Sequence, residues 1–188
     1  MPRKFIFTKE EIQNAVLDLT REKGISAVTA RALGAKLGTS SQPIFGYFEN
    51  MADVHNAVIQ AANELHLTRL REEMENGKYP PYKASGMAYI RFAREEKELF
   101  KLLFMRDRAN EDKNRFDEGR EMLIDIIARQ VGISQEQARL FHLEMWAYVH
   151  GIATMIATGF YDWSEELCSQ TLTDMYQGLK YKYSGANL

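Results

Sequence analysis

A chain of 188 residues suffices for one or two small domains with a buried core. Its formal net charge of −2 excludes a protein that is basic along its whole length. Residues 1–50 are slightly positive, with seven Lys and Arg against five Asp and Glu, whereas residues 51–188 carry 17 against 21. Contact with phosphates depends on local charge, so the mildly positive N-terminal part is compatible with nucleic-acid binding.

The composition also bears on the compartment. Residues 1–7 are too short, and too closely followed by charges, for a signal peptide. The uncharged run 145–161 contains His150 and two glycines, which favours a buried helix over a membrane span. The single cysteine, Cys168, excludes an intrachain disulfide and suits a reducing compartment. We therefore expect a cytoplasmic protein without a membrane partner.

Two short helices are predicted at the N-terminal end. The first begins after Thr8, ends at Gly24 and has one apolar face, formed by Ile12, Ala15, Val16 and Leu19. The second follows Thr29, a good N-cap, and ends at Gly38, where the chain favours a residue that tolerates positive φ.

A third helix is predicted after this turn. Thr39 or Ser40 can cap it, and Pro43 falls in or just after its first turn, where a missing N–H costs little. Ile44 and Phe48, four residues apart, face the core. The outward face is almost uncharged and combines polar with aromatic residues: Ser41, Gln42, Phe45, Gly46 and Tyr47. Such a surface suits a DNA major groove better than a buried core, which predicts a helix-turn-helix; an ordinary helical hairpin is the alternative.

From about Thr8 to Val54 the chain resembles the N-terminal DNA-binding domain of the TetR/AcrR family of bacterial transcription regulators. The resemblance covers the apolar spacing of the first helix, the Gly24-Ile25 break, the run 29–38 and the close at 44–48. It implies an all-α protein with a three-helix helix-turn-helix domain. The residues implied for contact with double-stranded DNA are Thr29, Arg31, Ser40, Ser41, Gln42, Pro43, Phe45, Gly46 and Tyr47.

Some residues depart from the family pattern. The family usually has a tyrosine at Phe45 and a lysine at Met51, both of which contact DNA phosphates. Gly46 is smaller than the usual residue and costs about 1 kcal/mol in a helix interior. We therefore expect modest DNA affinity. By chemistry Arg31 suits a guanine edge and Gln42 an adenine edge, although either could contact phosphate instead.

The rest of the chain is predicted to be helical to its end. Ser134 and Gln137 form a capping box that opens a long helix. The charged segment 106–115 is expected to be a solvated connection. The expected helices cover about 51–76, 83–105 as one bent helix or two, 116–132 and 135–158. A last helix is expected to start at Asp162 or Ser164.

The C-terminal part resembles a TetR subgroup marked by a Trp…His-Gly sequence, here Trp146 to Gly151. This resemblance implies a homodimer through the last two helices, although these helices could simply be core. It also implies a small-molecule effector, apolar or amphipathic, between the middle helices. The candidate ligand-binding residues are Met87, Phe92, Phe104, Met122, Met145, Trp146 and His150, which at helical spacing could equally be core. His150 could offer a hydrogen bond to a ligand or be satisfied by neighbouring helices.

Neither catalysis nor a metal or other cofactor is expected. The four histidines, His55, His66, His142 and His150, lack metal-site spacing, and no nucleophile elbow, phosphate loop or dinucleotide fingerprint is present. We therefore predict a helix-turn-helix DNA-binding domain over 1–50 and a larger helical ligand-binding and dimerisation domain over 51–188. The predicted function is a ligand-responsive repressor that binds a palindromic operator. The alternative is a binding or adaptor protein of the same fold that has lost operator binding.

Overall fold

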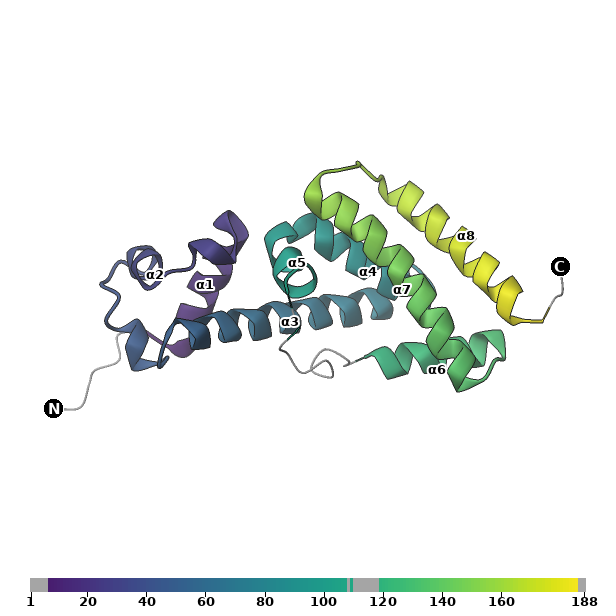
Figure 1. Ribbon diagram of the computed structural model, residues 1–188, viewed down its shortest axis with the longest axis horizontal. Coiled ribbons are helices and arrows are strands. Elements are labelled where there is room, and N and C mark those ends of the chain that lie inside the picture. Colours follow the sequence, from purple (N-terminus) through teal and green to yellow (C-terminus); the bar gives the residue numbers. More distant parts are fainter. Residues whose placement is uncertain (1–6, 108, 110–118, 186–188) are drawn as a thin grey trace. The chain divides into compact units, whose positions relative to one another are not determined.

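The computed structural model describes residues 7–107, 109 and 119–185, and the regular elements in these ranges are all helical (Figure 1). This confirms the all-α prediction. In chain order the elements are α1 (Lys9–Lys23), the 3-10 helix η1 (Ile25–Ala27), α2 (Ala30–Lys36), the 3-10 helix η2 (Ile44–Gly46), α3 (Met51–Glu75), α4 (Pro81–Glu95), α5 (Lys97–Phe104), α6 (Arg120–Val131), α7 (Gln135–Thr158) and α8 (Glu165–Tyr183).

The predicted capping residues define most helix ends. Thr8 and Glu11 form a reciprocal capping box at the start of α1, as Ser134 and Gln137 do at α7. Of the two candidates for the start of the last helix, Ser164 is the cap. The segment 83–105 forms two helices rather than one, separated at residue 96. Phe116 and most of the charged connection 106–115 lie outside the described residues.

Contacts divide the chain into two compact units. Unit 1 comprises Met1–Thr68 and Glu96–Arg106, and unit 2 comprises Arg69–Glu95 and Asp107–Leu188. The long helix α3 therefore begins in unit 1 and ends in unit 2. The predicted boundary after residue 50 falls at the start of α3, and the division of DNA binding and ligand binding across it stays a prediction.

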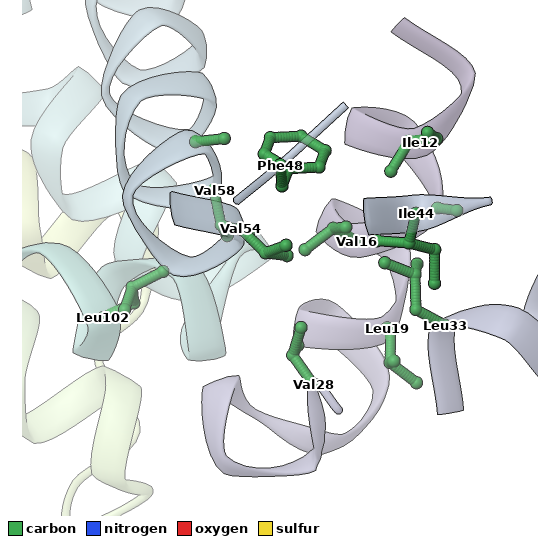
Figure 2. Close-up of a cluster of buried hydrophobic side chains, with 12 residues drawn as sticks. Ile12, Val16, Leu19, Val28, Leu33, Ile44, Phe48, Val54, Val58 and Leu102 are labelled. Atoms are coloured by element: carbon green, nitrogen blue, oxygen red, sulfur yellow. The ribbon is translucent and has the colours of Figure 1, made fainter. Parts of the chain in front are cut away.

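The core of unit 1 gathers apolar side chains from α1, α2, α3 and α5 and from the segment around η2. Figure 2 shows Ile44 and Phe48 among the aliphatic side chains of α1 and α3. Leu102 of α5 also belongs to this cluster, although almost fifty residues separate it from Val54. Removal of this surface from water holds the short N-terminal elements together, since they are too brief to be stable alone.

Unit 2 is built around α4 and α7, with α6 and α8 packed against them. α4 buries nine of its residues, including Met87, Tyr89 and Phe92. Gly86 lets the helices approach closely, because a Cβ at this position would lie 2.8 Å from Cδ2 of Leu172 on α8. The position of α4 is therefore set by its packing against α6, α7 and α8.

Candidate functional site

The turn after α2 has the geometry of a Schellman motif. Gly38 has a φ of +68°, in the left-handed region. The N–H of Thr39 donates to the carbonyl of Gly34 at 2.8 Å, and that of Gly38 donates to the carbonyl of Ala35 at 3.2 Å. A Cβ on Gly34 would lie 2.9 Å from the carbonyl oxygen of Thr39, so only glycine fits there without movement of the turn. Gly34 and Gly38 together set the direction of the chain after α2.

The segment after the turn is shorter than predicted. The expected α-helix over about 40–48 is wrong in extent, because only η2 is regular there. Pro43 has no N–H to bond the carbonyl four residues earlier, and it disfavours helical geometry at Gln42. Gly46 adds flexibility. Instead, the N–H of Gly46 donates to the carbonyl of Pro43 at 3.0 Å. Ile44 still reaches the core as predicted.

The predicted DNA-contact residues lie on α2 and on this segment. The exposed ones are Thr29, Arg31, Ser40, Gln42 and Phe45, and the half-buried ones are Ser41, Pro43, Gly46 and Tyr47. Thr29 is also committed to its cap, because its hydroxyl accepts from the N–H of Ala32 at 3.1 Å. Phe45 is 42% exposed and presents an apolar ring. This surface can offer a guanidinium, an amide and hydroxyls to a polyanion.

Tyr47 is less outward than predicted. Its hydroxyl donates to the backbone carbonyl of Phe7, and its ring packs against the core of unit 1 together with Phe7. The side chain therefore joins the beginning of α1 to the end of the DNA-contact segment. A purely outward position for Tyr47 is wrong, because its side chain is partly buried against the core; its role in DNA contact stays a prediction.

In unit 2, two tyrosines of α4 meet two histidines of α7. The hydroxyl of Tyr82 lies 3.1 Å from Nδ1 of His142, and that of Tyr89 lies 2.9 Å from Nδ1 of His150. Tyr82 and Tyr89 lie about two helical turns apart on α4, and His142 and His150 lie about two turns apart on α7. The tyrosine–histidine contact therefore occurs twice along the packed helices α4 and α7. His150 also faces Thr154, whose Oγ1 lies 3.5 Å from Nε2.

Burial keeps both pairs neutral. It raises the pKa values of Tyr82 and Tyr89, so both phenols keep their protons. Burial, with a smaller contribution from the charge of Arg120, lowers the pKa of His142 to about 4. Burial also lowers the pKa of His150. Each phenol can therefore donate to an unprotonated Nδ1.

The predicted ligand-binding residues are not all alike in position. Met87, Phe92 and Met145 are buried, whereas Met122 and Trp146 are exposed by 45% and 42%. Trp146 stacks on His150 with ring centroids 5.0 Å apart. Phe104 belongs to unit 1, and the other six residues belong to unit 2. Their role in ligand binding stays a prediction.

Several residues that define this architecture were not predicted from the sequence. They are Gly34, Gly86, Tyr82, Tyr89 and the ion pair of Arg21 with Glu96. The two tyrosines and the two histidines each lie about two helical turns apart, which is a signal for contact between their helices. The signal can be used only once α4 and α7 are known to be neighbours.

Among the described residues, no group of three or more His, Cys, Asp or Glu side chains is arranged to hold a metal ion. In the same ranges, no helix combines the length and the apolar character needed to cross a membrane.

Known proteins were compared with the chain in sequence and in structure. Residues 82–177, about half of the chain, match the family described as tetracyclin repressor-like, C-terminal domain. No curated protein matches the chain significantly.

Solved structures extend this similarity to the fold of the whole chain. A TetR-like transcriptional regulator from Rhodococcus sp. RHA1 superposes with a TM-score of 0.67 at 14% identity, covering 90% of this chain and 93% of its own. A TetR family member from Streptomyces coelicolor A3 gives 0.64 at 18% identity, covering 89% and 96%. The multidrug binding protein EbrR, complexed with imidazole, gives 0.55 at 14% identity, covering 88% and 93%. Together with the family match, this similarity shows that the chain belongs to the TetR family of transcription regulators, which are not enzymes.

Proposed function

We propose that this protein is a ligand-responsive repressor that binds a palindromic DNA operator as a homodimer. The observation that carries the proposal is the glycine-defined turn between α2 and η2, where Gly34 and Gly38 fix the start of the DNA-contact segment. Arg31 and Gln42 are exposed on the two sides of this turn. A guanidinium and a carboxamide are the side chains that recognise guanine and adenine edges in a major groove.

The proposed homodimer forms through α7 and α8. Both helices keep large apolar side chains in contact with solvent, among them Leu143, which is 57% exposed. Exposed apolar side chains of this kind favour burial against a second copy of the same helices. The exposed apolar residues on the two helices are Leu140, Leu143, Trp146, Leu167 and Tyr181. Two DNA-binding segments in such a dimer would contact half-sites about 34 Å apart.

The proposed effector is a small molecule that binds in unit 2 and releases the DNA. The family assignment and the imidazole bound to EbrR support this part of the proposal. The predicted contacts that belong to unit 2 are Met87, Phe92, Met122, Met145, Trp146 and His150. An effector would act only through a difference in its affinity for the DNA-bound and the free conformations.

The second candidate is a binding or adaptor protein that keeps the fold and no longer binds an operator. Phe45 carries no hydroxyl for a phosphate, and the hydroxyl of Tyr47 is donated to the carbonyl of Phe7. Met51 offers no charge at a position where the family usually has lysine. These three positions are the observations that favour this candidate.

Selection from a pool of random duplex DNA at low salt separates the two candidates. The repressor proposal predicts enrichment of a roughly palindromic sequence with half-sites one helical turn apart. Failure to enrich any sequence at about 50 mM salt, with the protein shown to be folded, would favour the adaptor. Native mass spectrometry of the same preparation would report the dimer and any small molecule that co-purifies.

A further inference from the structure

Phe45 lies on a short segment whose backbone is tied to the core of unit 1. Ile44 and Phe48 are both buried in that core (Figure 2). The carbonyl of Ile44 accepts from the N–H of Tyr47 at 3.0 Å and from that of Phe48 at 3.2 Å. The hydroxyl of Tyr47 in turn donates to the carbonyl of Phe7. The residues on both sides of Phe45 are therefore held in place before any partner binds.

The ring of Phe45 is exposed although it is apolar. It is 42% exposed, and the described residues that form the core of unit 1 or pack against it do not include Phe45. In the described part of unit 1, Phe45 and Met105 are the large apolar side chains that stay exposed, and only Phe45 lies in the DNA-contact segment. Contact with an apolar group of a partner would remove this ring from water and stabilise the complex.

The chemistry of DNA restricts which group could make that contact. A phosphate requires a hydrogen-bond donor or a cation, and a phenyl ring supplies neither. The base edges in the major groove present nitrogen and oxygen donors and acceptors, with one apolar exception, the C5 methyl group of thymine. The neighbouring side chains of Ser41 and Gln42 can serve the polar groups, whereas Phe45 suits the methyl group.

We infer that Phe45 is a specificity-determining residue that selects a thymine in each half-site by burying its C5 methyl group. The inference rests on the proposed function, because it requires the DNA-contact segment to lie in the major groove. It deepens that function by naming the base and the atom that this side chain recognises. A ring that contacted a sugar, or stacked on an unpaired base, would not depend on the methyl group.

Deoxyuridine provides the test, because it lacks the C5 methyl group and keeps the pairing edge and the O4 acceptor of thymine. Each thymine of the selected duplex is replaced in turn, at the equivalent position of both half-sites, and binding of the full chain is measured by fluorescence anisotropy. One position should be sensitive, with affinity about fourfold weaker for each methyl group removed. At that position Phe45→Ala should bind the thymine and the deoxyuridine duplex equally, and more weakly than the wild type binds the thymine duplex.

Met105→Ala is the matched control, since Met105 is 41% exposed in the same unit and lies outside the DNA-contact segment. It should keep both the affinity and the preference for thymine. Phe45→Leu keeps an apolar side chain and should keep part of the preference. Thermal melting of each variant establishes that it is folded.

Several results would overturn the inference: a selected sequence without thymine, no position at which deoxyuridine weakens binding, or the same preference for thymine in Phe45→Ala as in the wild type. Each of these contradicts the role of Phe45 alone, because the selected duplex is still bound. Failure to enrich any duplex instead contradicts the proposed repressor, and the inference is lost with it.

Discussion

Arg21 of α1 and Glu96, the residue before α5, form a bidentate ion pair. Nε of Arg21 donates to Oε2 at 2.8 Å and Nη2 donates to Oε1 at 3.1 Å. The Glu96 side chain is only 8% exposed, whereas that of Arg21 is 36% exposed. The pair connects two elements of unit 1 that lie 75 residues apart in sequence. Because Glu96 separates α4 from α5, the same residue also marks the point where the chain enters unit 1 for the second time.

Arg21→Ala should destabilise unit 1 by about 1–3 kcal/mol, because the buried Glu96 carboxylate loses two hydrogen bonds from a charged donor. Chemical denaturation measures the free energy of unfolding. Asp18→Ala removes the exposed partner of the same arginine and serves as the control, with an expected change below about 0.5 kcal/mol. Equal changes in the free energy of unfolding for the two variants would contradict a stabilising role of the bidentate pair.

Gly34→Ala should distort the turn after α2, because the new Cβ would lie 2.9 Å from backbone atoms of Thr39 and Ser40. Backbone cannot move aside as a flexible side chain can, so we expect a loss of stability of about 1–3 kcal/mol and weaker DNA binding. Gly151→Ala is the matched control, since a Cβ there meets nothing within 4 Å in a helix. This control should be neutral or stabilising by up to about 1 kcal/mol. A neutral Gly34→Ala would contradict the account of the turn.

The pairing of Tyr82 with His142 predicts a dependence of stability on pH. Burial lowers the pKa of His142 from its ordinary value of 6.5 to about 4, so between these values the unfolded chain binds a proton that the folded chain does not. Stability is therefore full above pH 6.5 and falls as the pH drops toward 4. The loss attributable to His142 should be about 2 kcal/mol between pH 7.5 and pH 5.

His142→Asn tests this assignment. Its side-chain oxygen can accept from Tyr82 near the position of Nδ1, but it does not titrate. Denaturation of wild type and variant at several pH values should show a smaller loss for the variant over the same interval. Identical pH profiles would assign the acid sensitivity to other groups.

Leu143→Glu tests the proposed dimer. Leu143 is 57% exposed on α7, and a carboxylate at this position would be buried without a partner in an α7–α8 interface. Light scattering coupled to gel filtration should show the wild type as a dimer and the variant shifted toward monomer. Met105→Glu, at a site 41% exposed in unit 1, is the control for added charge and should leave the mass unchanged. A variant Leu143→Glu that stays fully dimeric would place the interface elsewhere.

Local signals predicted the elements of this fold well. Caps such as Thr8, Thr29 and Ser134 act within one turn of their own helix, so their residue types specify where the helices begin. The core positions Ile12, Val16 and Ile44 were also correct, because each follows the apolar period of its segment. The family, and with it a protein that is not an enzyme, followed from the same pattern and is confirmed.

The errors and omissions concern contacts between distant residues. A helix over 40–48 would have to accommodate Pro43 and Gly46, which both disfavour helical geometry. In the structure only the short η2 is regular, and Ile44 and Phe48 still reach the core. Tyr47 was placed outward because periodicity does not show that Phe7 is near. The pairs of α4 and α7 likewise depend on which helices are neighbours, and that is decided by packing of the whole unit.

The most direct test of DNA binding by the segment around α2 and η2 compares Arg31→Ala and Gln42→Ala with matched substitutions in unit 2. Fluorescence anisotropy on the selected duplex should show about five- to hundredfold weaker binding for each variant. The controls are Arg129→Ala and Gln177→Ala, which remove the same side-chain types from exposed positions on α6 and α8 and should bind as the wild type does. Equal affinities of all four variants, or losses confined to the controls, would contradict the assignment of DNA recognition to this segment.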